Sequence, residues 1–106
     1  MQIKSMIDDK QNKCIVKLEG EIEVNVVADF KKQMDELLLQ CPNIDFDCEN
    51  LEYIDSTGLG AVVYVYKKAK EIGGTVRVLK LKKYIYKLFE ITALNRLFDI
   101  EVNENE

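Results

Sequence analysis

The chain has 106 residues, of which 47% are apolar and 32% are charged, and its formal net charge at pH 7 is −4. These values are typical of one globular domain, and the acidic balance argues against a nucleic-acid-binding protein that relies on overall positive charge. Histidine is absent from the sequence, which excludes a Ser-His-Asp triad, a Cys-His pair and any histidine-ligated metal site.

The three cysteines are Cys14, Cys41 and Cys48, and no two of them have the C-x-x-C spacing. This pattern predicts reduced thiols rather than a disulfide framework or a zinc site. The first ten residues lack the apolar core of a signal peptide. The longest uncharged apolar run, 58–66, is far shorter than the roughly 20 residues needed to span a bilayer. We therefore expect a cytoplasmic protein without membrane contact.

Five short segments alternate apolar and polar residues, which is typical of half-buried strands. Many of the polar positions are charged, among them Asp45, Arg77 and Asp99, so we expect one face of the sheet to be open to water. The first two segments are close enough in sequence to form a hairpin. The five predicted strands are centred on residues 1–7, 14–18, 44–48, 76–78 and 98–102.

Helical spacing of apolar residues separates these strands. Asn25 is a candidate cap for a helix that runs to about Leu39, and Gly73-Gly74 is a stop signal for a helix over about 57–72. Shorter helices are predicted at about 83–90 and 94–97. The order ββαβαβααβ predicts a single α/β domain over 1–106, with a mixed, mostly parallel five-stranded sheet and helices mainly on one face.

The most unusual segment is Tyr53–Gly60, which reads YIDSTGLG and opens the second helix. Ser56 and Thr57 stand where a helix cap belongs, and two glycines in the first turn suggest close approach by another backbone or by a partner. A helix N-terminus favours an anion, including a phosphate attached to Ser56. An ordinary cap explains the same residues, and the pattern alone leaves both interpretations open.

Other chemical interpretations of the sequence lack essential residues. A nucleophile elbow needs glycine where Ile54 stands, and the phosphate-binding motifs G-x-x-x-x-G-K-[ST] and G-x-G-x-x-G are both missing. The acidic stretch 45–50 lacks the glycine and the final acidic ligand of a calcium loop, and it alternates like a strand. We therefore expect neither a metal nor a cofactor.

The segment Ile54–Gly60 resembles the STAS family, and within it the bacterial anti-sigma factor antagonists. Three other segments match the family in the same order: Leu18–Ile22, Glu71–Gly74 and Leu88–Leu94. The resemblance implies a STAS-like fold and a non-enzymatic partner switch. In that switch the unphosphorylated protein binds an anti-sigma factor serine kinase and releases the sigma factor. Phosphorylation of Ser56 ends the binding, and a phosphatase of the PP2C type resets the protein.

The expected partner-binding surface surrounds the start of the second helix, with Val24 or Val26 exposed beside it. The family commonly has aspartate where Glu23 stands, and often glycine at Ala93 and aspartate at Glu90. Two alternatives remain: a STAS subunit of another assembly, such as a stress-signalling complex or a lipid-transport system, and a small α/β enzyme that uses Ser56. The predicted partner-binding residues are Glu21, Glu23, Asp55, Ser56, Thr57, Gly58, Leu59 and Gly60.

Overall fold

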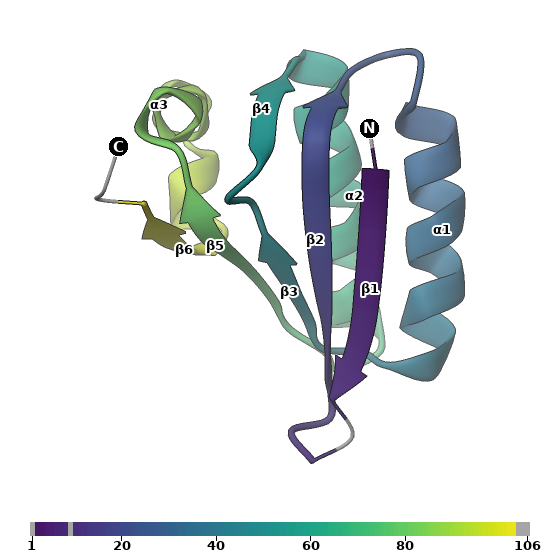
Figure 1. The fold of residues 1–106 in the computed structure, drawn as a ribbon. Coiled ribbons are helices and arrows are strands. Elements are labelled where there is room, and N and C mark those ends of the chain that lie inside the picture. Colours follow the sequence, from purple (N-terminus) through teal and green to yellow (C-terminus); the bar gives the residue numbers. More distant parts are fainter. Residues whose placement is uncertain (1, 9, 104–106) are drawn as a thin grey trace.

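A computed structural model describes residues 2–8 and 10–103 of the chain as a sheet covered by helices (Figure 1). In chain order its elements are β1 (Gln2–Asp8), β2 (Lys13–Ile22), α1 (Val27–Gln40), β3 (Ile44–Asp47), β4 (Leu51–Ile54), α2 (Ser56–Glu71), β5 (Val76–Leu81), α3 (Lys83–Ile91), a short 3-10 helix (Leu94–Arg96) and β6 (Asp99–Val102). In the described part of the chain, no helix is both long and apolar enough to cross a membrane.

The sheet has the strand order β1-β2-β3-β5-β6, and β4 pairs with the far end of β2. Strands β1 and β2 form an antiparallel hairpin, and all the other pairs are parallel, because a helical or long connection separates their strands. The predicted mixed, mostly parallel α/β sheet is therefore confirmed.

Strand β4 was not predicted from the sequence. Strands β3 and β4 run one after the other along β2: β3 pairs with residues 14–17 of β2 and β4 with residues 20–22, and the register of the β4 pairing shifts between Gly20 and Glu21. In β4 only Leu51 and Ile54 are buried. Buried residues three positions apart do not give the alternating pattern of a half-buried strand. The prediction of five strands was therefore wrong, because the sheet formed by the described residues has six.

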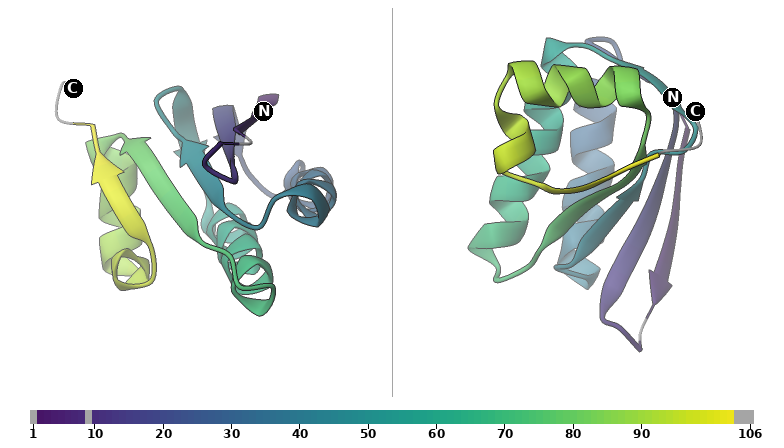
Figure 2. Two further views of the ribbon diagram at one scale, coloured as in Figure 1. Left: turned by 90° about the horizontal axis from the view of Figure 1, so that it is seen from below. Right: turned by 90° about the vertical axis from the view of Figure 1, so that its left-hand side faces the viewer.

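The helices lie on one side of the sheet, as predicted (Figure 2). Facing them is a row of apolar side chains across four strands, in which Val16 pairs with Phe46, Phe46 with Val78, and Val78 with Ile100. The Phe30 ring of α1 packs 6.1 Å from the Phe46 ring, measured between centroids. The core thus forms where the apolar phase of the strands meets the apolar stripe of α1.

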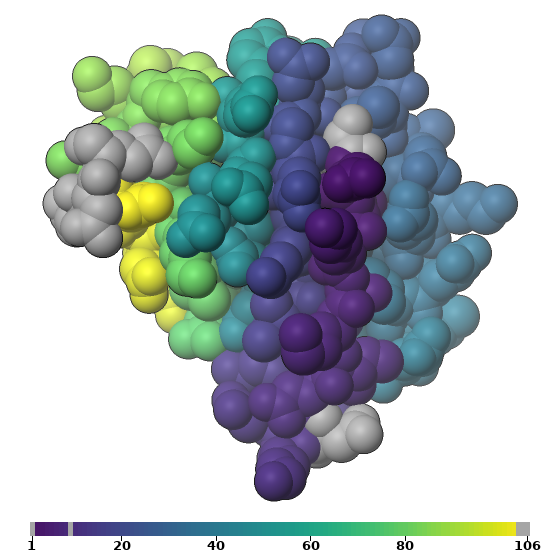
Figure 3. All heavy atoms as spheres, in the orientation of Figure 1, coloured from purple at the N-terminus to yellow at the C-terminus, as the bar shows by residue number. Residues whose placement is uncertain are grey.

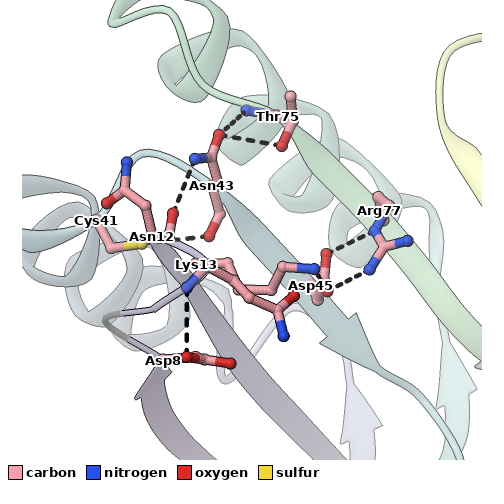
Figure 4. Close-up of polar contacts among 9 residues, drawn as sticks. Asp8, Asn12, Lys13, Cys41, Asn43, Asp45, Thr75 and Arg77 are labelled. Atoms are coloured by element: carbon pink, nitrogen blue, oxygen red, sulfur yellow. Dashed lines mark hydrogen bonds and ion pairs between the residues drawn. The ribbon is translucent and has the colours of Figure 1, made fainter.

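The opposite face of the sheet is not covered by a helix, as expected (Figure 3). Charged residues of β2 and β5 lie on this face. Arg77 on β5 lies between Asp45 on β3 and Asp99 on β6. Asp45 is only 5% exposed, and it is covered by charged side chains rather than by a helix. Arg77 donates two hydrogen bonds of 2.8 and 2.6 Å to the Asp45 carboxylate, and the Lys13 ammonium lies 3.2 Å away from it (Figure 4). These bonds hold the pKa of Asp45 below its ordinary value.

The first helix begins one residue later than the sequence predicts. Asn25 does not cap it, because the Asn25 side chain and backbone both donate to the Glu23 carboxylate, at 3.0 and 3.1 Å. Val26 occupies the cap position of α1 without a side-chain hydrogen bond. The predicted ends of the second helix are right within one residue, and Gly73 leaves it with a φ of +78°.

Candidate functional site

The N-terminus of α2 begins directly after β4, and Asp55 caps it. The Asp55 Oδ1 atom accepts a 2.7 Å hydrogen bond from the Gly58 N–H. The prediction that Ser56 caps the helix was therefore wrong: Ser56 is its first residue. A carboxylate one position earlier reaches the same free N–H groups and leaves the serine side chain available.

Asp55 also connects the start of α2 to the loop between β2 and α1. Its Oδ2 atom accepts from the Val24 N–H at 3.2 Å, and its own N–H donates to the Ile22 carbonyl at 3.2 Å. Both carboxylate oxygens thus have backbone donors within the domain. Asp55 holds together the two segments that border Ser56.

The two glycines of the first turn have different environments. A Cβ atom on Gly58 would lie 2.5 Å from the Ile22 carbonyl oxygen and 2.7 Å from the Ile54 Cγ1 atom, so only glycine lets the helix pack on the end of β2. A Cβ atom on Gly60 would meet nothing within 4 Å. The sequence left open whether another backbone or a partner approaches these glycines. At Gly58 it is the backbone, whereas Gly60 lies open on the surface.

Ser56 and Thr57 are both exposed, so exposure does not distinguish them. Within the described part of the chain, no group forms a hydrogen bond with the Ser56 hydroxyl. Val24 is 62% exposed in the loop that Asp55 holds beside this helix end, as expected of at least one valine of that loop. The accessible surface here thus includes Val24, Ser56, Thr57 and Gly60.

The other predicted partner-binding residues are buried or half-buried in the domain, except for Glu21. Leu59 is 6% exposed and belongs to the core, and Gly58 is buried beneath the helix end. Glu21 is exposed on β2, while Glu23 is half-buried and accepts hydrogen bonds from Asn25. Three of the predicted partner-binding residues therefore have contacts within the domain: Gly58, Leu59 and Glu23.

A groove beside Ser56 was not predicted from the sequence. The groove has a volume of about 410 Å³ and lies between the start of α2 and the last turn of α3. Neither Leu88 nor Thr92 was predicted as a site residue, because more than 30 positions separate them from Ser56 in the sequence. The one available signal was the resemblance of Leu88–Leu94 to the family. The groove is lined by Tyr53, Ile54, Asp55, Ser56, Leu59, Leu88 and Thr92.

Metal ligands do not cluster anywhere in residues 2–8 and 10–103. In the acidic stretch that resembles a calcium loop, Asp45 is bound by Arg77, and Asp47 accepts from the Glu49 N–H at 3.1 Å. The strand interpretation of 44–47 is confirmed by β3.

Known proteins resemble this chain in sequence and in overall fold. The anti-sigma-B factor antagonist of Bacillus subtilis strain 168 is 30% identical over 100 residues, which cover 94% of this chain and 92% of that protein. The TM1081 protein of Thermotoga maritima has a similar fold, with a TM-score of 0.85, 23% identity, and coverage of 93% of this chain and 85% of that one.

A third comparison concerns the Bacillus cell fate determinant SpoIIAA, whose structure is known in the phosphorylated form. It matches with a TM-score of 0.73 and 17% identity, over 97% of this chain and 94% of that one. The STAS domain family matches residues 4–106. On this match, together with the Bacillus subtilis relative and the shared fold, the chain belongs to the STAS domain family.

Proposed function

We propose that this protein is an anti-sigma factor antagonist that acts by partner switching. In the unphosphorylated state it binds an anti-sigma factor that is also a serine kinase, and the sigma factor is released. The kinase then transfers the γ-phosphoryl group of ATP to the Ser56 hydroxyl oxygen, ADP and the hydroxyl proton are released, and the complex dissociates. A phosphatase of the PP2C type hydrolyses the phosphoserine and restores the first state.

The observation that carries this proposal is the position of Ser56. Its hydroxyl is exposed at the first position of α2 and is not used in capping, since Asp55 has that role. The free N–H groups of a helix start favour a phosphate there. The name of the Bacillus subtilis relative supports the antagonist role, and SpoIIAA supports the existence of a phosphorylated form in this fold.

The relatives are named for regulation, which confirms the expectation of a non-enzymatic domain. A role for Ser56 as an enzyme nucleophile has no structural support, because the hydroxyl has no hydrogen-bonded base among the described residues. The choice between a free antagonist and a subunit of a larger assembly depends on the partner, which the following experiment identifies.

The test uses purified serine kinases of the histidine-kinase-like ATP fold from the same genome. With ATP, one of them should add a single phosphate to the wild-type protein and to Thr57→Ala, but none to Ser56→Ala. The unphosphorylated form should bind that kinase, and the phosphorylated form should not. Phosphorylation of Ser56→Ala to the wild-type extent would contradict the assignment of Ser56.

A further inference from the structure

The side of the sheet that no helix covers, called the open face below, has an uneven distribution of charge. Its strands follow the order β1-β2-β3-β5-β6, and Figure 3 shows β1 in purple and β6 in yellow at opposite edges. Lys4 of β1 and Lys17 of β2 lie directly opposite each other near one edge. Asp99 and Glu101 of β6 are exposed at the other edge. The open face therefore has a basic edge and an acidic edge.

The lysines of the basic edge are only partly neutralised within the domain. Like charges directly opposite each other on two strands repel. Lys4 forms an ion pair of 3.3 Å with Glu19, but Lys17 is exposed and forms none in the described part of the chain. The carboxylate of Asp47, the partner of Lys17 on β3, lies 3.8 Å from the Lys80 ammonium instead. Positive charge is thus left unpaired on β2.

The carboxylates of the acidic edge are also unpaired. The pKa of Arg77 is raised, first by its hydrogen bonds to Asp45 and also by the charges of Asp99 and Glu101, so both of these side chains lie near Arg77 on the open face. Arg77 is bound to Asp45, and neither Asp99 nor Glu101 forms an ion pair among the described residues. In the sequence, residues 103–106 add two glutamates and no cation.

The strand order determines how two open faces can meet. Strand β3 is the middle strand of the five. A two-fold axis that runs along β3, between two facing sheets, therefore places β1 and β2 of one copy over β6 and β5 of the other. The basic edge of each copy then lies over the acidic edge of its partner, and the two contacts are identical by symmetry. A second copy of the chain thus presents both charges in the order that this face requires.

The same axis brings particular residues together, because rotation about it keeps the height of every residue along the strands. Lys4 pairs with Lys17, and Lys17 and Leu79 both pair with the same residue of β3, so the three share one row. Glu101 has the same height on β6, since it follows the partner of Val78. The two lysines of one copy therefore face Leu79 and Glu101 of the other.

We propose that the open face is a homodimer interface, in which two copies stack their sheets about a two-fold axis along β3. Apolar contacts add to the charges: Met6 is 61% exposed on this face, and Ile15 beside it and Leu79 are half-buried. The dimer is weak, because the face also carries charges that lose water on contact. This inference does not depend on the proposed function. Helix α2 lies on the opposite side of the sheet, so Ser56 stays accessible in both copies (Figure 2).

Sedimentation equilibrium of the unphosphorylated wild-type chain tests the dimer. We expect a reversible monomer–dimer equilibrium whose dissociation constant rises at least tenfold between about 50 mM and 500 mM NaCl, because salt screens the ion pairs. A protein that stays monomeric up to about 1 mM at low salt would contradict the proposal. A dimer that salt does not weaken would contradict it as well, since the charges would then not hold it together.

A charge-reversal pair tests which residues face each other. Lys17→Glu alone makes both of these positions acidic, and Glu101→Lys alone makes both basic, so each variant should dimerise at least tenfold more weakly than the wild type. An equal mixture of the two should form a dimer again, because both contacts then join opposite charges. This recovery also shows that both variants are folded.

The matched control is Lys67→Glu, which makes the same charge change at an exposed position of α2, on the helical side. It should dimerise like the wild type. If the mixture of Lys17→Glu and Glu101→Lys stays monomeric, or if Lys67→Glu weakens the dimer as much as Lys17→Glu, the open face is not the interface. The phosphorylation of Ser56 is measured separately, so failure of the dimer leaves the partner switch intact.

Discussion

At the scale of single residues, Asp55 decides how Ser56 is presented. Its carboxylate caps α2 by accepting from the Gly58 N–H, and it also accepts from the Val24 N–H. The Ser56 hydroxyl is therefore not needed as a cap. In this chain Asp55 thus has a structural role next to Ser56. A direct role of Asp55 at the partner interface stays a prediction.

Replacing Asp55 tests this structural role. Asp55→Ala removes the acceptor of two backbone N–H groups, so we expect a loss of about 1–2 kcal/mol in the free energy of unfolding, as for other helix caps. Asp55→Asn keeps an oxygen at the cap and should lose less. Urea unfolding followed by circular dichroism measures both variants. Equal stability of Asp55→Ala and the wild type would contradict the capping role.

Ala93 has a backbone conformation that disfavours its side chain. Its φ of 61° and ψ of 14° lie in the left-handed region, where glycine has no steric penalty. We expect Ala93→Gly to raise the free energy of unfolding by about 0.5–1 kcal/mol. In Ala28→Gly, at the second residue of helix α1, the change should have the opposite sign. Thermal unfolding of the two variants compares them, and a lower stability of Ala93→Gly would contradict this account.

At the scale of elements, the charged row on the open face joins three strands. Lys13 of β2 and Arg77 of β5 both contact the Asp45 carboxylate of β3, which is almost inaccessible to solvent. Neighbouring strands are thereby held on the face that no helix covers. Because Asp45 is buried and doubly paired, this contact matters more than the exposed pair of Lys4 and Glu19.

The contribution of these ion pairs should appear in how the free energy of unfolding changes at acid pH. The pKa of Asp45 is lowered in the folded state, so its contribution is fully present above the ordinary value of 3.8 and is lost as the pH falls through the lower folded pKa. At pH 7, Asp45→Asn should lower the free energy of unfolding by about 1–3 kcal/mol. The difference from the wild type should shrink below about pH 4. Denaturant unfolding from pH 7 to pH 2 measures it.

Asp99→Asn is the control for this experiment, since Asp99 is exposed on the same face. Its stability should follow that of the wild type within about 0.5 kcal/mol at every pH. A pH-independent difference between Asp45→Asn and the wild type would contradict the assigned role of the carboxylate charge.

At the scale of the whole molecule, the switch should work without unfolding. Ser56 is exposed at a helix start, and the neighbouring Asp55 carboxylate is already held by backbone N–H groups. A phosphate there should change the stability of the helix by only about 0.3–1 kcal/mol. Its effect must therefore fall on the interface.

Comparison of the two forms tests this view. The phosphorylated and unphosphorylated proteins should have nearly the same circular dichroism spectrum and melting temperature, while their affinities for the kinase should differ at least a hundredfold. Ser56→Ala should bind in all conditions, and Ser56→Asp should imitate phosphorylation in part, because it carries less charge. If phosphorylation lowered the melting temperature by about ten degrees, a global change would replace the local mechanism.

The sequence by itself determined the α/β class, the mixed and mostly parallel sheet, the helices on one face and the family, because alternation and helical spacing are local and the motif is contiguous. Only the tertiary structure decided that β4 continues the line of β3 along β2, that Gly58 packs against the Ile22 carbonyl, and that Leu88 and Thr92 border Ser56. These features depend on distances between segments far apart in the chain, and no local pattern of residues specifies such distances. The groove beside Ser56 could therefore not be predicted from the sequence.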